Sequence, residues 1–230
     1  MATTTRLPPI LLALTAVTGI VDAVSYLALG RVFTANMTGN VVLLAFAVAG
    51  APGLSIPRSA TALLAFFAGA VVGGRIALRM TNGPQHVWAG VAFGIEALLL
   101  LAAAAVSMGP AVATSGHPTG VYGAIVLTAL AMGLRNAVVR RIGLPDLTTT
   151  VLTLTITGLA SDSSLAGGGN PRWARRLASV ALMFTGAAAG VLLVRRSLAL
   201  PLAVSGVIAG VCALAVVFGA RSTSVEPATS

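Results

Sequence analysis

Residues 10–29 read ILLALTAVTGIVDAVSYLAL, an apolar run interrupted by a single acid, Asp22. A transmembrane helix needs about 20 consecutive, mostly apolar residues, so this stretch predicts a helix that spans a membrane. The whole chain has the same character, because 57% of its 230 residues are hydrophobic and 8% are charged. Soluble domains have about 25% charged residues, and disorder requires low hydrophobicity. The composition therefore excludes both an ordinary soluble domain and a disordered chain.

Further apolar runs predict an all-α fold, a polytopic bundle of transmembrane helices. Six segments are long enough to cross a membrane: 8–29, 59–80, 87–108, 118–139, 174–195 and 198–220. Two shorter apolar stretches, 33–50 and 147–160, have the length of re-entrant or half-helix segments. These segments leave no room for a soluble catalytic domain, so residues 1–230 are predicted to form a single integral membrane domain.

A weak internal repeat relates the two halves of the chain, 8–108 and 118–220. The matching pieces are residues 19–23 (GIVDA) with 133–137 (GLRNA), offset by 114, and residues 67–73 (FAGAVVG) with 184–190 (FTGAAAG), offset by 117. With three crossings in each half, the repeats would be inverted, which is a common plan among transporters. The alternative is chance similarity between helices rich in small residues.

All 14 basic residues are arginine, and with five acids they give a formal charge of +9. Most lie at the ends of apolar runs, so they indicate membrane orientation and not a nucleic-acid partner. Nine arginines lie inside and four outside if both short segments re-enter and the N-terminus is cytoplasmic. A seven-span arrangement gives the same split, so the crossing number stays open. The single cysteine, Cys212, excludes an intramolecular disulfide and a cysteine metal cluster, and no metal or cofactor is expected.

Among the charged residues inside the predicted spans, three are candidates for a functional role: Asp22, Glu96 and Arg135. A charge in the middle of a membrane costs about 2.5–3.5 kcal/mol on insertion scales. Asp22 shares a helix face with Thr18. It is interpreted either as a proton or cation site or polar gate, or as a packing acid paired with arginine. Glu96 has no polar neighbour on its own face, which favours a structural ion pair with Arg75 or Arg135 over a protonatable carrier. Arg135 is expected to snorkel to the interface, with acid pairing or anion binding as alternatives.

The most informative segment is FTANMTGN, residues 33–40. In contact with lipid its polar groups would be unsatisfied, so they must lie at an interface, line a cavity or pack inside the protein. The second half supplies threonines between residues 148 and 157. We expect the two segments to form a solute site. The alternative is that their polar side chains serve only as helix caps and as hydrogen-bond partners of the local backbone. The predicted substrate-binding residues are Asp22, Asn36, Thr38, Gly39, Asn40, Asn136, Thr149, Thr150 and Thr153.

Residues 19–27 (GIVDAVSYL), followed by residues 33–40, resemble the opening signature of the YoaK-like family. This is a family of bacterial multipass membrane proteins built on a domain of unknown function. Residues 133–137 and 148–153 resemble its second signature, although the family pattern tends towards glutamine where this chain has Arg135. The resemblance covers nearly the whole chain. It implies a multipass protein of the bacterial cytoplasmic membrane, and it implies no substrate.

The leading functional hypothesis is a small-solute transporter or channel-like permease, because polar groups lie inside apolar spans. The second is a non-transporting membrane scaffold or assembly partner that binds through its small-residue faces, although packing within one chain is the default interpretation and a homo-oligomer stays open. The sequence has no P-loop, H-E-x-x-H or catalytic G-x-S-x-G, so neither an ATP-driven pump nor an enzyme is expected. The expected partners are the lipid bilayer and a small-molecule or ion substrate, with no nucleic acid.

Overall fold

The computed structural model describes residues 7–80, 83–108, 118–143 and 152–221, which are helical apart from short connections. Six long, apolar helices are α1 (Leu7–Ala28), α3 (Ile56–Arg79), α4 (Gln85–Met108), α6 (Pro118–Ile142), α8 (Trp173–Val194) and α9 (Ala199–Arg221). Two short helices, α2 (Met37–Val48) and α7 (Leu152–Ser161), occupy the two shorter apolar stretches, and a 3-10 turn, η2 (Ser164–Ala166), follows α7. The predicted all-α polytopic bundle is confirmed.

Local sequence signals explain where helices begin. Ser55 caps α3, because its hydroxyl accepts a hydrogen bond from the Arg58 N–H at 3.4 Å. A proline in the first turn of α3 needs no N–H partner there. Asn36 caps α2 in the same way, accepting from the Gly39 N–H at 3.2 Å. The polar residues between the apolar runs therefore mark the starts of both helices.

The long helices form a bundle with α1, α4 and α6 as its most buried members. Leu14, Phe93, Leu100 and Met132 pack in its core without solvent exposure. The outer helices α3 and α8 present large apolar side chains outward; Phe67 is 69% exposed and Phe184 is 74% exposed. This distribution suits a bilayer, because lipid tails solvate apolar side chains as well as a protein core does.

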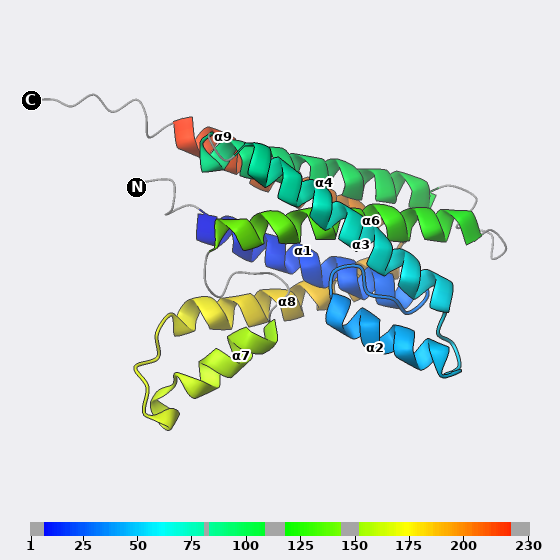
Figure 1. Ribbon diagram of the computed structural model, residues 1–230, viewed down its shortest axis with the longest axis horizontal. Helices are drawn as coiled ribbons and strands as arrows, with labels where there is room; N and C mark the ends of the chain where they lie inside the picture. Colours follow the sequence, from blue (N-terminus) through cyan, green and yellow to red (C-terminus); the bar gives the residue numbers. More distant parts are fainter. Residues whose placement is uncertain (1–6, 81–82, 109–117, 144–151, 222–230) are drawn as a thin grey trace, which may run out of the picture.

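The packing of the helices follows the offsets of the sequence repeat. Helix α1 packs on α8 and α9, and its counterpart α6 packs on α3 and α4. The short helices repeat the relation, since α2 lies on α3 and α7 lies on α8. Figure 1 shows α2 and α7 on the same side of the bundle, starting near its middle and running towards opposite ends. The helices of the two halves are therefore interleaved, and the long helices of each half pack mainly against long helices of the other half.

Glycines make the closest of these contacts. A Cβ atom on Gly19 of α1 would lie 2.3 Å from the Met183 carbonyl oxygen on α8. At the corresponding position in the second half, a Cβ on Gly133 of α6 would lie 2.0 Å from the Phe66 carbonyl oxygen on α3. Because no real Cβ approaches an oxygen so closely, only glycine allows these backbones to touch.

Replacing Gly133 with alanine should therefore destabilise the protein by at least about 1–3 kcal/mol, because the added methyl group forces α6 away from α3. Gly94 in α4 provides a matched control, since a Cβ there meets nothing within 4 Å. Thermal unfolding in detergent should show a lowered midpoint for Gly133→Ala, whereas the midpoint of Gly94→Ala should not be lowered. Equal midpoints for the two variants would contradict the close α3–α6 contact.

Candidate functional site

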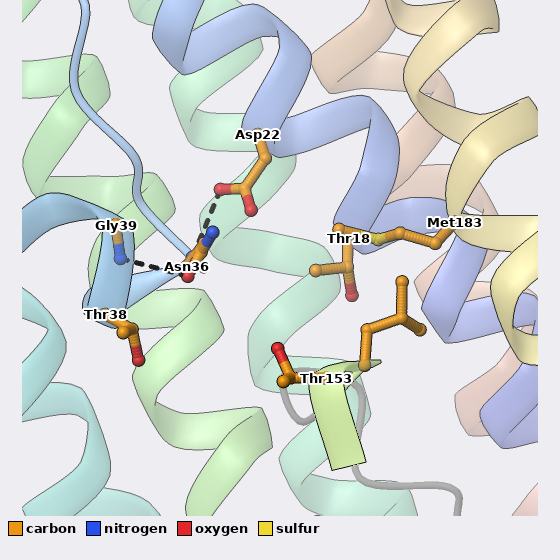
Figure 2. Close-up of a pocket in the computed structure, with 8 residues that line it drawn as sticks. Thr18, Asp22, Asn36, Thr38, Gly39, Thr153 and Met183 are labelled. Atoms are coloured by element: carbon orange, nitrogen blue, oxygen red, sulfur yellow. Dashed lines mark hydrogen bonds between the residues drawn. The ribbon is translucent and has the colours of Figure 1, made fainter. Parts of the chain in front are cut away.

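A pocket of about 270 Å³ lies where α1, α8 and the beginnings of the two short helices meet (Figure 2). The lining residues come from four segments of the chain: Thr18, Asp22, Asn36, Thr38, Gly39, Leu152, Thr153 and Met183. Under the repeat offset of 114, Thr38 corresponds to Leu152, and Gly39 corresponds to Thr153. The same turn of each short helix therefore contributes to the pocket. Asp22 and the two short segments, far apart in the sequence, lie together around one space.

Among the described residues, Asp22 is the one acid that lines this pocket, and it is only 6% exposed. Its Oδ1 atom accepts hydrogen bonds from the Ala35 N–H at 2.9 Å and the Asn36 N–H at 3.3 Å. Figure 2 shows the carboxylate between Asn36 and Thr18, with its second oxygen directed towards the open space. These N–H donors stabilise the carboxylate inside the bundle, and no side chain among the described residues forms a hydrogen bond or ion pair with its second oxygen.

The polar residues at the start of α2 divide into two groups. Thr38 and Gly39 line the pocket, and Asn36 both lines it and caps the helix. Asn40, predicted to bind substrate, is fully buried and does not line the pocket. Its Oδ1 atom accepts from the Phe33 N–H at 3.3 Å, and its Nδ2 atom donates to the Ser59 carbonyl at 3.1 Å. Asn40 therefore ties the preceding loop to α3, which holds the beginning of α2 in place.

Behind the pocket, Arg135 is completely buried, and the prediction that it snorkels to the interface is wrong. Its Nη1 atom donates to Glu96 Oε1 at 3.0 Å and to the Leu14 carbonyl at 2.9 Å. Its Nη2 atom donates to the Thr18 hydroxyl at 2.6 Å. Both terminal nitrogens of the guanidinium therefore find acceptors on α1 and α4 inside the bundle, so the side chain does not extend to water. Glu96, also fully buried, therefore forms the ion pair with Arg135 that was one of its two predicted pairings.

The other predicted site residues lie elsewhere. Asn136, the counterpart of Asp22 under the repeat offset, donates its Nδ2 to the Met132 carbonyl of its own helix and does not line the pocket. Thr149 and Thr150 fall outside the described residues. Thr153 lines the pocket and is exposed to it.

Three lining residues were absent from the predicted set. Thr18 had a signal in the sequence, since it lies one helical turn before Asp22 on the same face. The sequence offered no such signal for the other two lining residues, Leu152 and Met183. Met183 reaches the pocket because α8 packs closely on α1, with Gly19 against the Met183 carbonyl, and this contact joins residues far apart in the sequence.

An ion pair between α8 and the segment after α7 holds α7 in position. Arg176 of α8 donates to the Asp162 carboxylate at 2.7 Å and to the Gly158 carbonyl at 2.7 Å. The hydrogen bond from Arg176 lowers the pKa of Asp162 below its ordinary value. These contacts fasten the end of α7 to α8 and so help to fix Thr153, at its other end. Among the described residues, no group of three or more histidine, cysteine or acidic side chains could hold a metal ion.

Comparison with known sequences places the chain in a family. The family described as "Protein of unknown function (DUF1275)" matches residues 10–217. The chain belongs to the DUF1275 family. This DUF1275 chain is also 35% identical over 157 residues to the UPF0700 transmembrane protein YoaK of Bacillus subtilis (strain 168). The aligned region covers 67% of the DUF1275 chain and 65% of YoaK, and no solved structure matches. The resemblance to the YoaK-like family is thereby confirmed.

Family membership and the six apolar helices together make the DUF1275 chain a multipass membrane protein. The description of the family assigns no activity, and the name of YoaK states only that it is a transmembrane protein. The function of the DUF1275 chain must therefore be argued from its own pocket.

Proposed function

We propose that this chain is a small-solute permease, and that its solute binds in the pocket between α1, α2, α7 and α8. The observation that carries the proposal is the polar lining of this pocket inside an otherwise apolar bundle. Within the described part of the chain, the hydroxyls of Thr38 and Thr153 have no hydrogen-bond partner. Both side chains are exposed, and both line the pocket, so their hydroxyls are open to a solute that could pair with them.

The arrangement of the short helices supports the same proposal. Transporters often place their substrate near the middle of the membrane, where discontinuous helices meet at the interface between internal repeats. Here α2 and α7 each contribute their first turn to the pocket and then run towards opposite ends of the bundle (Figure 1). The volume of about 270 Å³ is ample for a small solute, since one water needs only about 10–15 Å³ by the same kind of measure.

The alternative function, a scaffold that binds partners through its glycine faces, has less support. Gly69 lies against the Leu130 carbonyl of α6, and Gly186 lies against the Ala16 carbonyl of α1. Gly73 and Gly190 face the same two helices. These four glycines are engaged within the chain, so they offer no free surface to a partner. We also propose that the chain acts in the bacterial cytoplasmic membrane and catalyses no reaction, as its sequence leads us to expect.

Uptake by proteoliposomes tests the permease. The purified chain is reconstituted, and the entry of radiolabelled sodium, rubidium, methylammonium, chloride and glycerol is compared with entry into protein-free liposomes. We expect at least one of them to enter faster with the protein present. Replacing Thr153 with phenylalanine should block this entry by filling the pocket.

The control for pocket filling is Leu154→Phe, since Leu154 is the next residue on α7, is 69% exposed and does not line the pocket. This variant should retain the uptake of the wild type. If no probe enters faster than in protein-free liposomes, the permease is excluded and the scaffold becomes the better hypothesis.

A further inference from the structure

We propose that the pocket binds a small monovalent cation, an alkali metal ion or an ammonium group, at the free carboxylate oxygen of Asp22. This inference rests on the permease proposed above and names its class of solute. The juxtaposition that carries it is a buried carboxylate that forms no salt bridge in the described part of the chain, facing the hydroxyls of Thr38 and Thr153 across a cavity.

The first argument is the charge of the pocket. Within the described residues, Asp22 forms no salt bridge, and its two hydrogen bonds come from neutral backbone groups. The nearest strong cation in the network, Arg135, is already paired with Glu96 at 3.0 Å. Because Arg135 and Glu96 neutralise one another, Asp22 is the one negative charge that remains among the described residues lining the pocket. A buried carboxylate is stable only when it is paired, and a bound cation would complete that pair.

The second argument concerns the start of α2, because a helix N-terminus usually attracts anions. Here most of its donors are already in use by acceptors of the protein. The N–H groups of Ala35 and Asn36 bind Asp22, and that of Gly39 binds the Asn36 side chain. The Met37 N–H bonds to the Ala35 carbonyl at 3.1 Å. An anion would therefore find few free donors on α2 and would face the Asp22 charge.

The third argument is the set of ligands around the carboxylate. The hydroxyls of Thr38 and Thr153 supply neutral oxygen atoms, which suit hard cations and can also accept from an ammonium N–H. Leu152 and Met183 complete the wall with apolar surface. Calcium sites provide six to eight oxygens with several carboxylates, and the part of the lining that the structure describes offers one carboxylate. A single positive charge matches this lining best.

Thermal stability in detergent tests for the bound cation. The probes are sodium chloride, potassium chloride and methylammonium chloride, each compared with choline chloride at the same ionic strength. At tenfold its Kd, a bound cation should raise the unfolding midpoint of the wild type by on the order of 3 °C, saturably. Comparison of the three salts separates an alkali metal ion from an ammonium group. Equal midpoints in all four salts would overturn the proposal.

Two variants locate the effect. Asp22→Asn should lose the salt-specific shift, whereas Leu154→Phe, at an exposed residue that does not line the pocket, should keep it. If Asp22→Asn does not fold, the double variant Thr38→Val/Thr153→Val keeps the carboxylate and should shrink the shift at a given salt concentration. A shift that survives the removal of Asp22, or one that the removal of both hydroxyls leaves undiminished, would place the cation elsewhere and overturn the proposal.

The uptake panel separates this inference from the permease itself. Entry of sodium, rubidium or methylammonium, with chloride and glycerol excluded, supports both. Entry of chloride or glycerol alone would support the permease proposal but would overturn the proposal that the pocket binds a cation. A cation-specific thermal shift without uptake of any probe keeps the cation site and overturns the permease.

Discussion

Replacing Asp22 with asparagine should reduce solute uptake to the level of protein-free liposomes. The asparagine side chain has the same shape, and its amide oxygen can still accept from the Ala35 and Asn36 N–H groups. It loses the negative charge that faces the pocket. Because the backbone contacts survive in neutral form, the free energy of unfolding should change by about 1 kcal/mol or less. The measurement is uptake normalised to reconstituted protein, together with abundance in the membrane and the unfolding midpoint.

A swap between the repeat counterparts provides a stringent control for Asp22. The double variant Asp22→Asn/Asn136→Asp keeps the total charge of the chain but moves the carboxylate to α6. Asn136 does not line the pocket, and its side chain bonds within its own helix. The swap should therefore stay inactive. Uptake equal to the wild type in either variant would remove Asp22 from the mechanism.

Much of the fold could be predicted from the sequence, because the spans are a property of composition. An apolar run of sufficient length must form a helix in a membrane, where every backbone group needs an internal partner. The runs at 59–80 and 174–195 correspond to α3 and α8 within a few residues. The two short stretches also became helices, and Asn36, as a polar residue before an apolar run, marks the start of one of them.

The site could be predicted only where a local pattern encodes it. Asp22 and Thr18 share a helix face, and the polar group at 36–39 stands out between apolar runs. Asn40 belongs to the same group but bonds to Ser59, nineteen residues away, so its structural role depends on how α2 lies against α3. No periodicity reveals such a contact.

Arg135 shows the same limit more sharply. Its position near the end of an apolar run favoured snorkelling, since a long side chain can reach the interface at little cost. The position of the Arg135 side chain depends instead on its acceptors Glu96 and Thr18, which lie 39 and 117 residues away in the sequence. Only the packing of α6 against α4 and near α1 brings these acceptors within reach.

Replacing Arg135 with methionine should therefore destabilise the protein by about 3–5 kcal/mol, the largest effect that we expect on stability. The substitution leaves Glu96 as a buried, uncompensated carboxylate, and breaking a buried ion pair on one side typically has this cost. It also removes the donors to the Leu14 carbonyl and the Thr18 hydroxyl. Unfolding in detergent, followed by temperature or denaturant, measures the loss. Arg195→Met is the matched control, since Arg195 is exposed at the end of α8, and it should change stability little.

The double variant Arg135→Met/Glu96→Met separates the ion pair from the space that it fills. Apolar residues of similar volume often replace a buried ion pair without loss of stability, so the double variant should be clearly more stable than Arg135→Met alone. Since Glu96 does not line the pocket and Asp22 keeps its charge, the double variant should also retain cation-specific stabilisation, weakened only through the lost contact to Thr18. If the double variant were as unstable as Arg135→Met, the cost would lie in the bonds from Arg135 to α1, and the charge on Glu96 would not be its source.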